Sequence, residues 1–121
     1  MKPNMSKTAA LRAAQEACGR ITRRSSTDYV CYVPYYDDKL DGPSTELQAS
    51  TYPQLVAHRA RKVARIAAGL MGLVPDSDKE AWIDLECAFE DAERCGTKPA
   101  KELLEAGIKA MRPCCGRRWK A

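Results

Sequence analysis

Three segments of the sequence place apolar residues at helical spacing, and this pattern commits most of the chain to amphipathic helices. The first stripe is Val56, Ala60, Val63, Ala64, Ala67, Leu70 and Met71. The second is Ala81, Trp82, Leu85, Ala88, Phe89 and Ala92. The third is Ala100, Leu103, Leu104, Ile108 and Met111. Each stripe predicts a helix that buries one face and leaves the other to water.

Start and stop signals frame these three helices. Thr51-Tyr-Pro-Gln54 and Ser77-Asp-Lys-Glu80 have the form of capping boxes, in which a side-chain oxygen at the helix start accepts a backbone N–H. Gly72 and Gly96 are typical helix stops, and Pro113 is expected to end the last helix. The third helix is expected to begin at Thr97-Lys-Pro.

A further helix is predicted near the N-terminus. Ser6 can cap it, and its buried stripe is narrow: Ala10, Leu11, Ala14, Ala17, Cys18 and Ile21. Alanine contacts contribute little burial energy each, but they allow this helix to lie close to a neighbouring element.

Between the first helix and the long second one, the sequence changes to the β-branched and aromatic residues of a strand. Tyr29, Cys31, Val33 and Tyr35 alternate with Val30, Tyr32 and Tyr36 over residues 28–36. Residues 37–43 are rich in turn formers, and Thr45, Leu47 and Ala49 alternate after them. The pattern predicts a β-hairpin, and Pro34 suggests that its first strand lies at a sheet edge.

The predicted fold class is α+β: one compact domain over residues 1–121, in the order α-β-β-α-α-α, with an antiparallel β-hairpin packed on about four helices. Segments 1–6 and 113–121 are expected to be flexible tails. Gly107 lies on the last apolar stripe, where it weakens the helix by about 1 kcal/mol relative to alanine but allows close approach of a neighbour. No stretch of about 18 apolar residues indicates a membrane span, so no membrane partner is expected and a cytoplasmic location is favoured.

Charge is segregated along the chain in blocks of alternating sign. Residues 1–27, 55–75 and 108–121 are basic, whereas residues 28–54 and 76–107 are acidic, and the formal net charge is +4. Such a pattern offers surfaces that attract anions and surfaces that attract cations, so it favours steering toward a charged partner.

The tyrosines mark the first candidate binding site. Tyr29, Tyr32, Tyr35, Tyr36 and Tyr52 all lie in or near the predicted hairpin, and Asp37 and Asp38 follow directly. Tyrosine is favoured at protein interfaces because it supplies contact area at a small entropic cost. We therefore predict that Tyr29, Tyr32, Tyr35, Tyr36, Asp37 and Asp38 bind protein. The alternative is that helices cover both faces of the hairpin.

Basic residues mark a second candidate site, for nucleic acid. His58, Arg61, Lys62 and Arg65 share one face of the long helix, where they can track phosphates or simply form its solvated side. Arg23 and Arg24 extend this set. The C-terminal residues Arg117, Arg118, Trp119 and Lys120 combine cations with an aromatic ring that can stack on a base, although the same residues also suit an inert polar tail.

The sequence predicts no metal, cofactor or catalytic site. Cys87 and Cys95 lie eight residues apart, and Cys114 and Cys115 are adjacent, which is not the spacing of a structural zinc site. His58 is the only histidine and has no acidic neighbour close in sequence. No nucleophile is paired with a base, and no glycine-rich phosphate loop is present. We therefore expect a non-enzymatic protein.

Two functions follow from these sites. The first is a regulator or inhibitor that docks on a larger protein or nucleoprotein, as a monomer or homodimer. The second is a nucleic-acid-binding regulator, which the ten acidic residues of segment 76–107 disfavour. No specific residues identify a family. In size and charge segregation alone, the chain resembles small accessory proteins of phages and plasmids, including anti-CRISPR inhibitors.

Overall fold

The computed structural model describes residues 5–34, 43–75 and 77–111. The elements in chain order are α1 (Lys7–Ala17), β1 (Thr22–Ser25), β2 (Asp28–Pro34), β3 (Ser44–Ala49), α2 (Tyr52–Met71), α3 (Lys79–Ala92) and α4 (Ala100–Ala110). This order confirms the α+β class and the four predicted helices. The predicted hairpin is part of a larger sheet, because the described residues form three antiparallel strands in the order β1-β2-β3.

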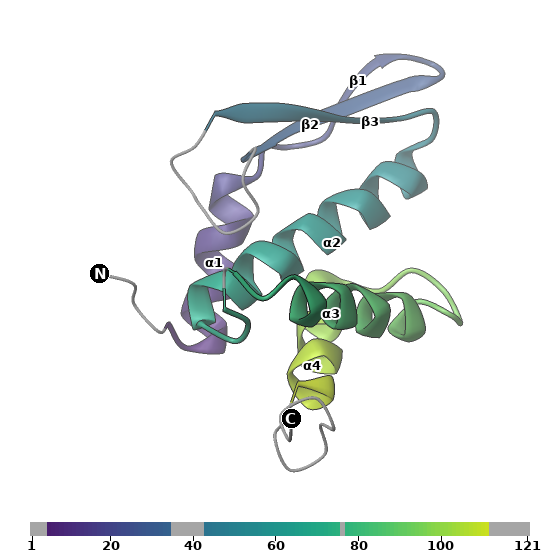
Figure 1. Cartoon of the computed structure of the whole chain (residues 1–121). Coiled ribbons are helices and arrows are strands. Elements are labelled where there is room, and N and C mark those ends of the chain that lie inside the picture. Colours follow the sequence, from purple (N-terminus) through teal and green to yellow (C-terminus); the bar gives the residue numbers. More distant parts are fainter. Residues whose placement is uncertain (1–4, 35–42, 76, 112–121) are drawn as a thin grey trace.

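Helix α2 is the central element of the fold. It crosses beneath the sheet, and α3 and α4 lie on the side of α2 away from the strands (Figure 1). Its contacts reach α1, β2, β3 and α4. The side chains buried deepest come from several elements: Val33, Leu55, Val63, Ile66, Leu85, Phe89, Leu103 and Leu104. The apolar stripes of the sequence thus meet in one core around α2.

The helix starts largely follow the predicted caps. Ser6 accepts a hydrogen bond from the Ala9 N–H at 3.2 Å, and Thr51 accepts one from the Gln54 N–H at 3.3 Å. At the start of α3 the prediction of Ser77 as the cap was wrong by one residue. Asp78 is the cap, and its carboxylate accepts from the Ala81 N–H at 3.0 Å. An acidic cap is also favoured by the positive end of the helix dipole.

Strand β1 replaces the predicted last turn of the first helix. Helix α1 ends at Ala17, so Ile21 does not belong to its stripe as predicted. The Gly19 N–H donates to the carbonyl oxygen of Tyr32 at 2.7 Å, and a Cβ at Gly19 would lie only 3.1 Å from that oxygen. This close approach of the backbone to β2 turns the chain, and Thr22–Ser25 then pairs antiparallel with β2.

The prediction that Pro34 marks an edge strand was also wrong, because β2 is the central strand. The physical requirement behind it is nevertheless met. Strand β1 pairs with β2 only as far as Val30, so Pro34 has a single paired neighbour, Ser44 of β3. Proline is tolerated there because its missing N–H breaks no bond to β1.

The two faces of β2 differ as the alternation predicts. Cys31 and Val33 are each 1% exposed and belong to the core cluster. Tyr32, between them, points the other way and is 51% exposed. All helices in the described part of the chain lie on one side of the sheet (Figure 1), so the Tyr32 side carries no helix.

Gly107 provides the close contact predicted for it. A Cβ at this position would lie 2.5 Å from Leu85 Cδ1 and 3.3 Å from Phe89 Cε1. Both side chains are fully buried on α3. The missing side chain therefore lets α4 pack tightly against α3.

Candidate protein-binding surface

The helix-free face of the sheet, here named the outer sheet face, gathers side chains from all three strands. Strand pairing sets Val30 opposite Gln48, and Tyr32 opposite Glu46. The residues of this face are Arg24, Asp28, Val30, Tyr32, Glu46 and Gln48. Val30 is only 3% exposed, so the accessible apolar surface here belongs to Tyr32.

Charged side chains on the outer sheet face are bonded to one another. The Arg24 guanidinium donates to Asp28 Oδ2 at 3.0 Å and to Glu46 Oε2 at 2.9 Å. The Gln48 amide donates to Asp28 Oδ1 at 3.1 Å. The Tyr32 hydroxyl donates to Glu46 Oε1 across 3.5 Å. One arginine on β1 therefore links β2 and β3 across the whole sheet.

The hydrogen bonds also shift the protonation equilibria of this network. Hydrogen bonding to Arg24, and then to Gln48, lowers the pKa of the Asp28 carboxyl. The bond to Asp28 in turn raises the pKa of Arg24. Exposed ion pairs contribute little to stability, about 0–1 kcal/mol. What this network provides instead is a fixed arrangement of donors and acceptors around an exposed aromatic ring.

The other predicted protein-binding residues are placed differently. Tyr29 faces the core side, where its ring meets that of Tyr52 edge-on with centroids 6.0 Å apart. Tyr52, at the start of α2, is 54% exposed. The predicted sites Tyr35, Tyr36, Asp37 and Asp38 lie outside the described residues.

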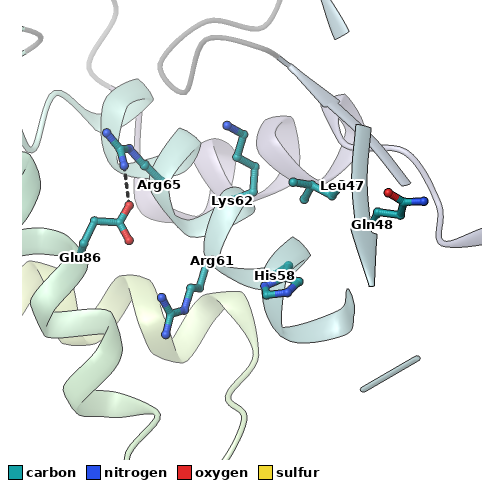
Figure 2. A pocket seen from close by; sticks show the side chains of 7 residues that line it. All are labelled: Leu47, Gln48, His58, Arg61, Lys62, Arg65 and Glu86. Atoms are coloured by element: carbon teal, nitrogen blue, oxygen red, sulfur yellow. Dashed lines mark hydrogen bonds and ion pairs between the residues drawn. The ribbon is translucent and has the colours of Figure 1, made fainter. Parts of the chain in front are cut away.

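The basic residues of α2 line a hollow of about 380 Å³, here named the basic groove, between the sheet and α3. Its lining residues are Leu47 and Gln48 of β3, His58, Arg61, Lys62 and Arg65 of α2, and Glu86 of α3. Figure 2 shows Leu47 turned toward α2 and Gln48 turned away from it. The helical spacing of the four α2 residues thus places them on one face, as predicted.

Helix α3 neutralises two of these cations, which the sequence spacing did not reveal. Arg65 NH1 lies 2.6 Å from Glu86 Oε2 (Figure 2), and its guanidinium carbon stands 4.8 Å from the centre of the Trp82 ring. Arg61 NH2 lies 2.7 Å from Glu93 Oε1. Both arginines therefore join α2 to α3.

Glu93 makes the Arg61 contact structurally important. Its side chain is 11% exposed, and its Oε2 atom is buried without a hydrogen-bond partner. A carboxylate taken out of water needs a compensating cation. Arg61 supplies that charge, which commits it to holding the fold.

The remaining predicted nucleic-acid residues are scattered. Arg24 is held by Asp28 and Glu46 on the outer sheet face. Arg23 is exposed, and its side chain donates to the Ser25 carbonyl at 3.2 Å. Residues Arg117, Arg118, Trp119 and Lys120 lie outside the described residues. The structure therefore does not gather Arg23 and Arg24 with the basic groove into one cationic surface.

Arg59 has a structural role that no sequence signal indicated. It leaves α2 on the side of α1, and its guanidinium donates to the carbonyl oxygens of Gly19 at 2.7 Å and Cys18 at 2.9 Å. It also bonds the carbonyl and the side chain of Gln15. These bonds satisfy carbonyl groups left open at the end of α1.

The cysteines differ in exposure. Cys18 and Cys31 are buried, and this burial raises the pKa of Cys18 to about 11 and also raises that of Cys31. Both therefore stay protonated and unreactive near neutral pH. Cys87 and Cys95 are exposed. Within the described ranges, no three His, Cys, Asp or Glu side chains form a group able to hold a metal ion, and Cys114 and Cys115 lie outside those ranges.

Comparison with protein-family models, with curated proteins and with solved structures found no match to this chain. In the described part of the molecule, every helix is too short or too polar to cross a lipid bilayer. The function therefore has to be inferred from the arrangement of the residues.

Proposed function

We propose that this protein is a small non-enzymatic binding protein, a regulator or inhibitor that docks on a larger protein or nucleoprotein through its outer sheet face. The observation that carries the proposal is Tyr32, 51% exposed on a face without helices. An aromatic ring surrounded by polar groups that can exclude water has the composition of an interface hot spot.

The ordered polar network supports this proposal. Arg24, Asp28, Glu46 and Gln48 are already bonded to one another around the ring, so a partner would not have to order them. Binding costs fall when side chains are held in place before contact. The mixture of charges also suits a protein surface better than the uniformly negative backbone of a nucleic acid.

The proposal includes a cytoplasmic location, where thiols such as Cys87 and Cys95 stay reduced. An accessory protein of a phage or another mobile element, such as an anti-CRISPR inhibitor, is one concrete form of it. A nucleic-acid-binding regulator is the competing function. The ion pairs of Arg24, Arg61 and Arg65 count against it, because these charges already have partners.

Affinity capture from a bacterial lysate tests the proposal, with the wild-type chain, Tyr32→Ala and Thr8→Ala as baits. Thr8 is exposed on α1, far from the sheet face. We expect a protein retained by wild type and Thr8→Ala, lost with Tyr32→Ala, and still retained after nuclease treatment. Capture that depends on nucleic acid, or that Tyr32→Ala leaves intact, would refute it.

A further inference from the structure

The two edges of the sheet differ in how well they are protected against pairing. Strand β1 has four residues, two of them arginines, and its register with β2 shifts between Arg23 and Ser25. Short length, positive charge and irregular register are the usual means of blocking edge-to-edge pairing. Strand β3 has six residues in unbroken register with β2, and it contains no proline or lysine. Its outer edge therefore has none of these protections.

In the part of the chain that the structure describes, β3 pairs with β2 only. Backbone groups of an antiparallel strand point alternately to its two sides, so part of the N–H and C=O groups of Ser44–Ala49 face away from β2. These groups form a template for another strand. The basic groove lies beside the same strand, since Leu47 and Gln48 belong to its lining.

We propose that the free edge of β3 binds an extended acidic segment of the partner protein as a fourth, added strand. The proposal rests on the function proposed above and names the chemistry of the partner. Charge complementarity selects this occupant: the groove beside β3 presents Arg61, Lys62 and Arg65 together with His58, against the single carboxylate of Glu86.

Strand geometry defines the pattern of the segment. An added strand lies about 4.8 Å from β3, and its side chains alternate between the two faces of the sheet. Those on the α2 side fall toward His58 and Lys62, whereas those on the other side continue the face that carries Glu46. The preferred segment therefore has acidic residues at every second position and uncharged residues between them.

His58 offers a way to change the groove charge without breaking a contact. Its side chain is exposed and makes no hydrogen bond or ion pair with the described residues. His58→Glu therefore introduces a negative charge beside β3 with little effect on folding. Thr8→Glu, an exposed change of the same charge on α1, is the matched control.

The probe is a fluorescein-labelled ten-residue peptide of alternating Glu and Thr, measured by fluorescence anisotropy at low salt. A peptide of alternating Lys and Thr controls for charge. We expect saturable binding of the acidic peptide only. We also expect His58→Glu to weaken it about fivefold or more, as loss of an exposed attraction and gain of a repulsion implies, with Thr8→Glu unchanged. Absence of binding, or equal effects of the two variants, would overturn the proposal.

Backbone methylation tests the added strand itself. Two versions of the acidic peptide carry N-methyl groups on every second amide, one on the Glu residues and one on the Thr residues. Only one set of amides faces β3 in an added strand, so one version should bind at least about tenfold more weakly than the other. Equal affinities would show that the peptide does not pair with the edge.

The same variants separate this inference from the proposed function. If Tyr32→Ala abolishes capture of the protein partner while His58→Glu and excess acidic peptide have no effect on it, docking through the outer sheet face stands and the added strand is refuted. If a single-stranded oligonucleotide binds the groove more tightly than the peptide does and displaces it, the groove is a nucleic-acid site and the inference fails.

Discussion

The outer sheet face and the basic groove are both rich in charge, but their charges have different uses. On the sheet, Arg24 binds Asp28 and Glu46 beside an exposed tyrosine, and no helix covers the network. In the groove, Arg61 and Arg65 are bound to carboxylates of α3 and hold two helices together. The comparison teaches that a stripe of cations in a sequence does not amount to a cationic surface, because pairing between elements decides which charges are available.

The largest effect separates the helical core from the recognition surface. Leu85→Ala and Leu104→Ala should each lower the free energy of unfolding by about 2–5 kcal/mol, because both side chains are fully buried and their removal leaves a cavity. Tyr32→Ala on the outer sheet face should cost much less. Chemical denaturation measures all three, and a wild-type midpoint for either leucine variant would contradict the described core.

An intermediate effect tests whether Arg61 is structural. Arg61→Ala leaves the nearly buried Glu93 carboxylate without its cation and should cost about 1–3 kcal/mol of unfolding free energy. Arg94→Ala is the matched control, since Arg94 pairs with Asp91 at the surface, where its side chain is 77% exposed. Its expected cost is about 0.5 kcal/mol or less. Equal losses for the two variants in urea denaturation would show that Arg61 is no more structural than a surface arginine.

The smallest effect concerns acid stability of the outer sheet face. The folded pKa of Asp28 is lowered from its ordinary value of 3.8, so its contribution to stability is present above that value and is lost as pH falls through the folded pKa. Asp28→Asn should therefore flatten the loss of stability below about pH 4.

Glu90→Gln is the control for that measurement. Glu90 is exposed on α3, and its side chain makes no hydrogen bond or ion pair with the described residues. Urea midpoints followed between neutral and acid pH compare the variants. If Asp28→Asn and wild type lose stability in parallel, the Arg24–Asp28 pair does not contribute in solution.

How much of this fold was predictable depends on whether the signal is local. The caps at Ser6 and Thr51, the stop at Gly72 and the apolar stripes follow from neighbouring residues, and the structure confirms them. Strand β1 was missed because Thr22–Ser25 is exposed at every position and has no apolar residue to report its pairing. Its partner lies farther along the chain, and Gly19 sets the turn between them.

The candidate sites show the same limit. Alternation in β2 correctly predicted that Tyr32 and Cys31 face opposite ways. Helical spacing likewise placed His58 and Arg61 on one face of α2. Neither pattern could predict that Arg61 meets Glu93, because that contact depends on how α3 packs against α2. Availability of charge is a property of tertiary packing, and sequence spacing does not contain it.

The most direct test of the central claim compares two exposed apolar side chains on different faces. Tyr32 lies on the outer sheet face, whereas Ile83 lies on α3 and is 60% exposed. Titration of the captured partner against Tyr32→Ala should show a loss of about 2 kcal/mol or more in binding free energy, while Ile83→Ala should bind like wild type. A Tyr32→Ala variant that is folded and binds with wild-type affinity would contradict the claim that the outer sheet face is the docking surface.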